Sequence, residues 1–234
     1  MENLSLRPPG ARVIAGLLIL TATAEAMLIY LGRTYGATAQ ERLAPIPGDD
    51  IVAKPEVMTN HAITIDAPPE SVWPWLAQMG WHRAGWYTAR GVDRLLFPAN
   101  WASADRLIPE LQDITIGSFV PDGPPETKCG FIVAELDPGR ALVLHSTSHL
   151  PESWRTKYHA ALDWSWSFNL TPLDQGRRTR FLFRSRWMTR PWWFTLFGWF
   201  IVVPADLVMS RDMLHGVKER AERAILPVEV GESR

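Results

Sequence analysis

The chain has 234 residues, with 24 Lys and Arg, 25 Asp and Glu, and a formal net charge of −1. This balance gives no reason to expect a nucleic-acid partner, and the single cysteine, Cys129, excludes an internal disulfide. The length suits one domain with an appendage. The chain holds 12 tryptophans, a residue favoured in apolar cavities with a polar end and at membrane interfaces.

The first predicted element is an apolar segment from Val13 to Leu31, interrupted only by Glu25 and flanked by Arg12 and Arg33. Its length is close to the ~20 residues that a helix needs to cross a bilayer. Three interpretations stay open: a membrane anchor, a helix packed on the domain, and a cleaved signal peptide. The anchor accommodates the whole run. We therefore expect a single-pass N-terminal anchor and a membrane-associated protein, with the side of the membrane undecided.

The next stretch, 33–55, holds Gly, Pro and paired Asp residues with little periodicity, which predicts a linker. A folded domain then follows, and the tail after Pro227 is expected to be loose. The predicted organisation is an N-terminal tail at 1–12, an apolar helix at 13–32, a linker at 33–55, a domain at 56–226 and a C-terminal tail at 227–234.

The domain opens with a strand that runs directly into a short helix. Ile63 and Ile65 alternate with polar residues, as in a half-buried strand. Pro68 or Pro69 suits the first helical turn, and Gly80 marks the helix end.

Two antiparallel strand pairs are predicted next. Asp137-Pro138-Gly139 joins strands at 130–135 and 140–147, and a polar loop at 148–160 follows. The strands at 162–170 and 179–186 then place aromatic side chains on one face and polar side chains on the other. On that polar face, Arg184 and Arg186 are expected to be solvated or to meet anionic lipid.

The last two predicted elements are an apolar segment and a closing helix. The segment 191–203 is short for a membrane span, and three interpretations are open: burial at a cavity lip, insertion at a membrane interface, and a second span. From Pro204 to Ile225, the spacing of apolar residues predicts a long helix with one face toward the sheet. Gly216 inside this helix indicates a close approach of sheet or ligand.

The stretch 61–81, with its APPE and VWPWL motifs, and Arg83, Gly85 and Tyr87 after it, resembles the START-related helix-grip superfamily, also called SRPBCC. The resemblance implies an α+β helix-grip fold, a curved antiparallel sheet wrapped around a long C-terminal helix with a cavity between them. Here an N-terminal helix, expected to be transmembrane, precedes it. The superfamily includes polyketide cyclases, aromatases and lipid-transfer domains, so it indicates the fold more strongly than the activity. The similar pieces further along are Pro109-Glu110 with Gln112, 136–144, 166–168, 179–186 and 209–222.

We expect this cavity to bind a hydrophobic small molecule or lipid at or near a membrane. The alternative is an enzyme resembling polyketide cyclases or aromatases, with His145 and Ser185 as an inward polar pair. A third interpretation is a structural or partner-binding module with a filled interior and no pocket. The sequence shows no nucleophile elbow, phosphate loop, zinc spacing or dinucleotide fingerprint, so we predict no cofactor and no metal. The residues predicted to contact the ligand are His145, Trp164, Trp166, Phe168, Phe181, Phe183, Ser185, Met213, Leu214 and Val217.

Overall fold

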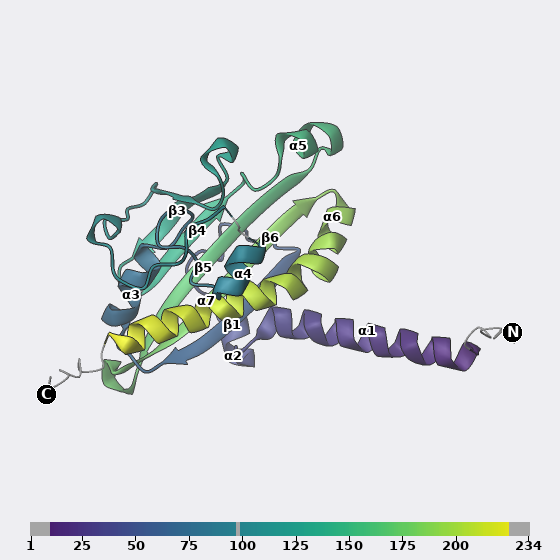
Figure 1. Ribbon diagram of the computed structural model, residues 1–234, viewed down its shortest axis with the longest axis horizontal. Helices are drawn as coiled ribbons and strands as arrows, with labels where there is room; N and C mark the ends of the chain where they lie inside the picture. Colours follow the sequence, from purple (N-terminus) through teal and green to yellow (C-terminus); the bar gives the residue numbers. More distant parts are fainter. Residues whose placement is uncertain (1–9, 97–98, 225–234) are drawn as a thin grey trace, which may run out of the picture.

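The computed structural model describes residues 10–96 and 99–224, and the predicted tail at 227–234 lies outside them. Its centre is one six-stranded antiparallel sheet in the order β1-β6-β5-β4-β3-β2, with α7 crossing its inner face (Figure 1). The strands are β1 (Val57–Ile65), β2 (Phe119–Pro121), β3 (Gly130–Asp137), β4 (Ala141–Ser146), β5 (Ala161–Leu173) and β6 (Arg178–Arg190). The main helices are α1 (Ala11–Thr34), α2 (Ala39–Leu43), α3 (Pro69–Ala77), α4 (Arg90–Leu96), α5 (Glu152–Tyr158), α6 (Trp192–Phe197) and α7 (Val203–Arg223), with a π-helical turn η4 (Gly198–Val202) joining α6 to α7.

The β5–β6 hairpin forms the aromatic inner face that the alternation predicts. Phe168 lies opposite Phe183 and Leu170 opposite Phe181 across the two strands. Trp166 lies opposite Ser185, so the same face continues toward the other end of the hairpin. Because successive side chains of a strand point to opposite faces, one hairpin supplies both the core and the polar outer surface.

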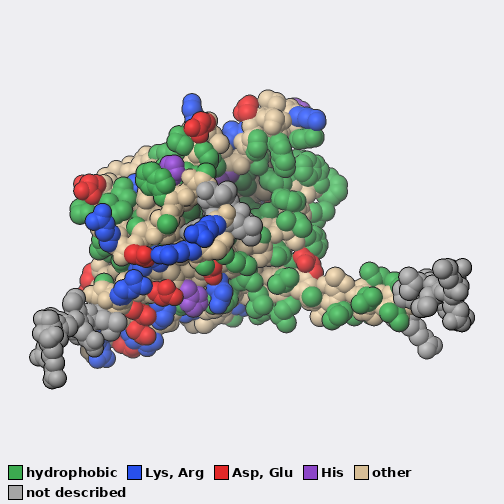
Figure 2. All heavy atoms as spheres, viewed as in Figure 1, with side chains coloured by type: hydrophobic (Ala, Val, Ile, Leu, Met, Phe, Trp, Pro, Cys, Tyr) green, Lys and Arg blue, Asp and Glu red, His purple; other side chains and the backbone are tan. Residues whose placement is uncertain are grey.

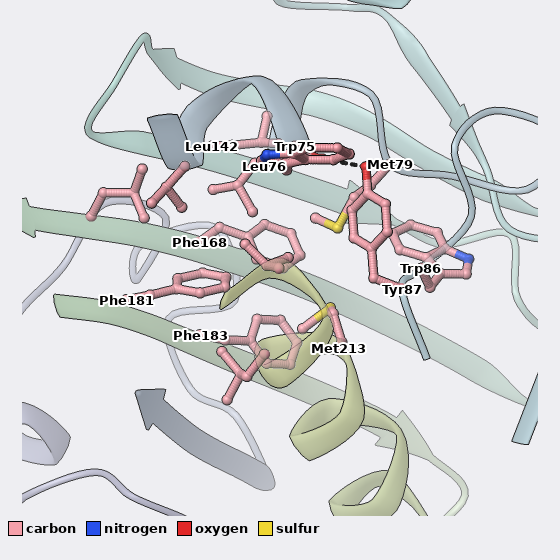
Figure 3. Packing of buried hydrophobic residues seen from close by; sticks show 14 of the residues in the cluster. Trp75, Leu76, Met79, Trp86, Tyr87, Leu142, Phe168, Phe181, Phe183 and Met213 are labelled. Carbon is pink, nitrogen blue, oxygen red and sulfur yellow. Dashed lines mark hydrogen bonds between the residues drawn. The ribbon is translucent and has the colours of Figure 1, made fainter. Parts of the chain in front are cut away.

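The core fills the space between the sheet and the C-terminal half of α7. Phe168, Phe181 and Phe183 are fully buried there, together with Leu214 of α7 (Figure 3). Side chains of α3 and of the segment after it complete the packing, and the Tyr87 hydroxyl donates to the Trp75 carbonyl at 2.9 Å. This part of the interior is closed.

Gly216 explains how the chain after α3 reaches α7. A Cβ at this position would lie 2.0 Å from the Tyr87 carbonyl oxygen, so only glycine permits this contact. A close approach at Gly216 is therefore present, but the partner is the backbone at Tyr87 and not the sheet or ligand that the sequence predicted.

Part of the outer face of the sheet is covered by the expected linker at 33–55, which is folded onto β5 and β6. A capping box formed by Thr38 and Glu41 starts α2 in this segment. Arg184 is 2% exposed and donates to the Asp49 carboxylate at 2.7 Å and to the Asn60 side chain at 2.7 Å. The expectation that Arg184 and Arg186 are solvated is thus wrong, because both guanidinium groups bind Asp49 and backbone carbonyls of this segment.

Helix α1 extends from the domain and contacts it only at its C-terminal end (Figure 1). A Cβ on Gly32 would lie 2.6 Å from the Val203 carbonyl oxygen of α7, so the two helices approach closely there. Arg33 packs over the Trp199 ring at 4.6 Å. The side chains before that point are mostly exposed, which does not fit a helix packed on the domain.

By length and composition alone, two helical stretches in the described part of the chain could cross a membrane, Val13–Thr34 and Trp192–Arg223. The second is the continuous run of α6, η4 and α7. Its C-terminal half packs its apolar stripe on the sheet, as a core helix does.

The loop predicted at 148–160 contains a helix, α5, that the sequence analysis missed. Trp154 and Tyr158 of this helix contact the rings of Trp193 and Phe194 in α6. These aromatic contacts hold α5 beside α6.

Candidate functional site

A largely apolar cavity of about 390 Å³ lies at the end of the sheet where α6 and η4 cover β5 and β6. It is in the size range of small-molecule sites. A smaller hollow of about 20 Å³ adjoins it and shares Asp122, Trp166, Asp206 and Met209 as lining residues. The cavity is lined by Asp122, His149, Leu150, Leu162, Trp164, Trp166, Trp187, Thr189, Phe194, Phe197, Gly198, Val202, Ala205, Asp206 and Met209.

At this end of the sheet, the covering helices leave unfilled space above the inner face. Strands β5 and β6 stay paired as far as Ala161 and Arg190, beyond the closed core under the C-terminal half of α7. Here α6 and η4 cover the sheet. Gly198 lies opposite the Trp187 ring and, as a glycine, has no side chain. A Cβ at Gly198 would lie 3.2 Å from that ring, so the absence of a side chain keeps space beside the indole.

The indoles of Trp164 and Trp187 are fixed by one hydroxyl group. Both Nε1–H groups donate to the Ser185 Oγ, at 2.7 Å from Trp164 and 2.6 Å from Trp187. Since their polar atoms are satisfied by Ser185, the indoles present apolar ring surface to the cavity. Ser185 thus acts as a support for the aromatic wall.

A connected polar cluster lies at one side of the cavity, where the loop after β2 meets the loop after β4. His149 Nε2 lies 3.0 Å from the Asp122 carboxylate, and its Nδ1 lies 2.8 Å from the Ser146 Oγ. The imidazole packs against the rings of Phe131 and Trp164, with centroids at 4.5 Å and 4.9 Å. These contacts hold both the ring plane and the carboxylate in place.

Asp206 of α7 lines the same cavity. Its Oδ2 atom is buried and has no hydrogen-bond partner among the described residues. Burial raises the pKa of this carboxyl above its ordinary value, because a charge removed from water is unfavourable. The nearby His61 has its pKa lowered, again by burial, and its Nε2 lies 2.6 Å from the Gly32 carbonyl oxygen.

A more polar hollow of about 600 Å³ lies outside the Asp122–His149 pair, between the segments at 122–129 and 148–155. The pair therefore separates this outer hollow from the apolar cavity. Cys129 lines the outer hollow, and burial raises the pKa of its thiol to about 11. A thiol with so high a pKa is a poor nucleophile at neutral pH.

The structure divides the residues predicted to contact a ligand into groups. Trp164 and Trp166 line the cavity, while Phe183 and Met213 line the small hollow beside it. Ser185 lies behind the indoles. The remaining inward residues, Phe168, Phe181, Leu214 and Val217, belong to the closed core.

The structure does not bring His145 and Ser185 together. His145 lies opposite Ser165 on the outer face of the sheet, and its Nε2 contacts the Asp163 carboxylate at 2.6 Å. Ser185 points to the inner face. The pair expected for a cyclase-like reaction therefore does not converge.

Asp122, His149 and Asp206 are site residues that were not predicted from the sequence. Asp122 and His149 are 27 positions apart on separate loops, so no local spacing joins them. Asp206 gave a detectable signal, a carboxylate three positions after the apolar segment 191–203. Among residues 10–96 and 99–224, no group of His, Cys, Asp and Glu is arranged to hold a metal ion.

No family model matches the sequence, and no curated protein is similar to it. A hypothetical protein from Helicobacter pylori is similar in structure over 79% of this chain and 99% of its own, with a TM-score of 0.48 and 12% identity. A norcoclaurine synthase from Thalictrum flavum covers 70% of this chain and 94% of its own, with a TM-score of 0.39 and 11% identity. An aromatase/cyclase from Streptomyces sp. R1128 covers 74% of this chain and 98% of its own, with a TM-score of 0.33 and 16% identity.

The chain has the helix-grip fold. Its strand order and its C-terminal helix against the inner face of the antiparallel sheet carry this assignment. The predicted α+β class and helix-grip architecture, an antiparallel sheet against a long C-terminal helix, are confirmed. The comparisons carry no argument about activity, which has to be argued from the cavity.

Proposed function

We propose that this protein binds a hydrophobic small molecule or lipid in the cavity beneath α6 and η4, at the surface of a membrane. The observation that carries the proposal is the cavity of about 390 Å³, walled by indoles and phenyl rings. Apolar surface that is exposed to water in a cavity is unfavourable. Binding of an apolar ligand buries this surface and contributes ~25 cal/mol of binding free energy per Å² of apolar area buried.

The covering segment is apolar on both of its sides. Phe194, Phe197 and Val202 line the cavity, while Trp192, Phe200 and Ile201 are exposed on the outside. Figure 2 shows hydrophobic side chains gathered over this flank and along α1, whereas charged side chains gather toward the C-terminal end of α7. A large exposed apolar patch marks a surface that meets a protein or a membrane.

Helix α1 supports the membrane as the partner of this flank. Its exposed apolar run is long enough to span the bilayer. Its C-terminal end packs on Val203 of α7 and on Trp199 of η4. A single-pass anchor there would hold α6 and η4 at the lipid interface, where tryptophan is favoured. The route from lipid to cavity would then be short.

Binding is tested with the full chain in detergent and the neutral fluorescent probe N-phenyl-1-naphthylamine. Ala205→Trp places an indole in the cavity, because Ala205 lines it. Val208→Trp is the matched control, since Val208 is 48% exposed on the same helix and does not line the cavity. We expect saturable probe fluorescence with the control and its loss with Ala205→Trp. Equal fluorescence from the two variants would mean that the probe reports only micelles.

The membrane contact is tested by hydroxyl-radical oxidation of the protein in lipid nanodiscs. Trp192 is 73% exposed and Trp101 is 61% exposed, so the two indoles differ mainly in position. We expect Trp101 to be oxidised and Trp192 to be protected by lipid. Similar oxidation of both would contradict the interfacial placement of α6.

A further inference from the structure

The cavity has two carboxyl groups in an otherwise apolar wall, and their surroundings differ. The Asp122 carboxylate accepts from His149 through Oδ2, and no hydrogen bond from a described residue reaches its other oxygen. Asp206 has an unpartnered buried Oδ2. Both residues line the main cavity and the small hollow beside it.

The two carboxyl groups offer opposite hydrogen-bonding capacities to a ligand. Asp122 borders the polar outer hollow and is held by an imidazole, so it presents a free acceptor oxygen. The carboxyl of Asp206 lies among mostly apolar side chains, with Ser210 as a hydrogen-bond partner, and forms no ion pair with a described Lys or Arg. A buried carboxyl without a cationic partner is more stable in its neutral form, which has an O–H donor.

The charged and titratable groups around Asp206 agree with this assignment. His61 is the titratable neighbour that acts on it electrostatically, and burial lowers the pKa of that imidazole, which favours its neutral form. On its own helix, Ser210 hydrogen-bonds the carboxyl. The pKa of Asp206 is raised by burial, which acts in the same direction and favours the neutral carboxyl.

We infer that this polar pair selects an apolar ligand that carries a hydroxyl group, an alcohol or a phenol, at the end near Asp122 and Asp206. The hydroxyl hydrogen is donated to the Asp122 carboxylate, and the hydroxyl oxygen accepts from the Asp206 carboxyl. A carboxylate ligand is disfavoured by the charge of Asp122. A hydrocarbon leaves both polar groups unpaired, at a cost in affinity. This inference rests on the proposed function, since it names the class of ligand for the same cavity.

Four unbranched ten-carbon competitors test the inference: 1-decanol, decane, decanoate and decylammonium. Each displaces N-phenyl-1-naphthylamine from the full chain in detergent, with Ala205→Trp as the blank. We expect decanol to bind about tenfold more tightly than decane, which corresponds to the gain of about one well-placed buried hydrogen bond. Tighter binding of decylammonium than of decanol, or no preference for decanol over decane, would overturn the inference.

Variants of the two carboxyls sharpen this test. Asp206→Asn keeps a donor and the shape of a neutral carboxyl, so we expect it to keep the preference for decanol. Asp206→Leu removes the hydrogen-bond donor. Asp122→Asn keeps an oxygen that accepts from His149, but it replaces the other acceptor oxygen by an NH2 donor. Both are expected to lose the preference. Asp163→Asn is the control, because Asp163 pairs with His145 on the outer face.

The outcomes separate the two proposals. If the probe does not bind the unmodified chain, the proposed function fails and the hydroxyl preference fails with it. If the probe binds, the variants are folded by that criterion, and only the inference is at risk. Equal losses with Asp206→Asn and Asp206→Leu would show that a charged Asp206 is needed and would contradict a neutral donor.

Discussion

The two ends of the inner sheet face carry similar aromatic residues, yet one end is closed and the other is hollow. At the closed end, Phe168 and Phe183 stack with centroids 4.9 Å apart against α7. At the open end, Trp164 and Trp187 are 5.7 Å apart, and their free ring surfaces line the cavity. Composition therefore does not decide whether an aromatic face is filled.

The covering elements decide it. The closed end is packed by α7, α3 and the segment through Tyr87, which reaches α7 because Gly216 has no side chain. The open end is covered by α6, η4 and the N-terminal part of α7, with Gly198 facing an indole. A cavity remains where the side chains of the cover do not interlock with those of the sheet.

The largest expected effect comes from truncating one phenyl ring at each end. Phe168→Ala should lower the free energy of unfolding by about 3 to 5 kcal/mol, because it leaves a void in a closed core. Phe197→Ala should lower it by only about 1 kcal/mol, since Phe197 is 45% exposed and already borders a cavity. Denaturant unfolding in detergent measures both. Equal costs would contradict the difference between the two ends.

A matched pair of glycines gives the next largest effect. Gly216→Ala should destabilise the protein by about 1 to 3 kcal/mol, because its Cβ would meet the Tyr87 carbonyl oxygen at 2.0 Å. Gly198→Ala should be close to neutral, since the nearest atom at 3.2 Å belongs to a side chain and alanine favours the helix. Thermal unfolding of the two variants is the measurement. A Gly216→Ala protein as stable as the parent would show that the Tyr87 segment does not close that end.

The smallest expected effect concerns the outer face and depends on pH. The pKa of Glu41 is lowered to about 2, first through its hydrogen bonds with Arg180, which measure 2.6 Å and 2.9 Å. A pKa lower in the folded state means that this stabilisation is full above the ordinary value near 4.5 and is lost as pH falls toward 2.

The test for Glu41 compares unfolding free energies of the parent and Glu41→Gln between pH 7 and pH 2. The parent should lose more stability over this range than the variant, because the variant has no carboxylate to protonate. The difference should be modest, as the ion pair is partly solvated. Parallel pH curves would show that the pair does not hold α2 on the sheet.

The two ends also differ in how far the sequence predicted them. Period-two alternation predicted the inner face of β5 and β6, including Trp164 and Phe168, because strand geometry alone sets that face. It could not separate lining residues from core residues, since that distinction depends on α6, η4 and the Tyr87 segment. Asp122 and His149 meet only through tertiary structure and have no local signature.

The outer face shows a different kind of failure. The stretch 33–55 was predicted to be a linker from its Gly and Pro content, although Thr38 and Glu41 have the spacing of a capping box. The alternation correctly placed Arg184 on the outer face, but the sequence pattern could not show that another segment covers it. Burial of Arg184 requires the Asp49 carboxylate, which is far away in sequence.

The most direct test of the account is photo-crosslinking of the full chain in lipid nanodiscs with an alkyl probe that carries a diazirine. In the proposed arrangement, bilayer lipid would reach only the outside of α6 and η4, whereas a bound ligand would also touch the sheet. We predict labelling of Trp164, Trp166 or Trp187, with loss of that labelling in Ala205→Trp. Labelling confined to outer residues such as Phe200 and Ile201, with none on these indoles, would contradict a ligand cavity.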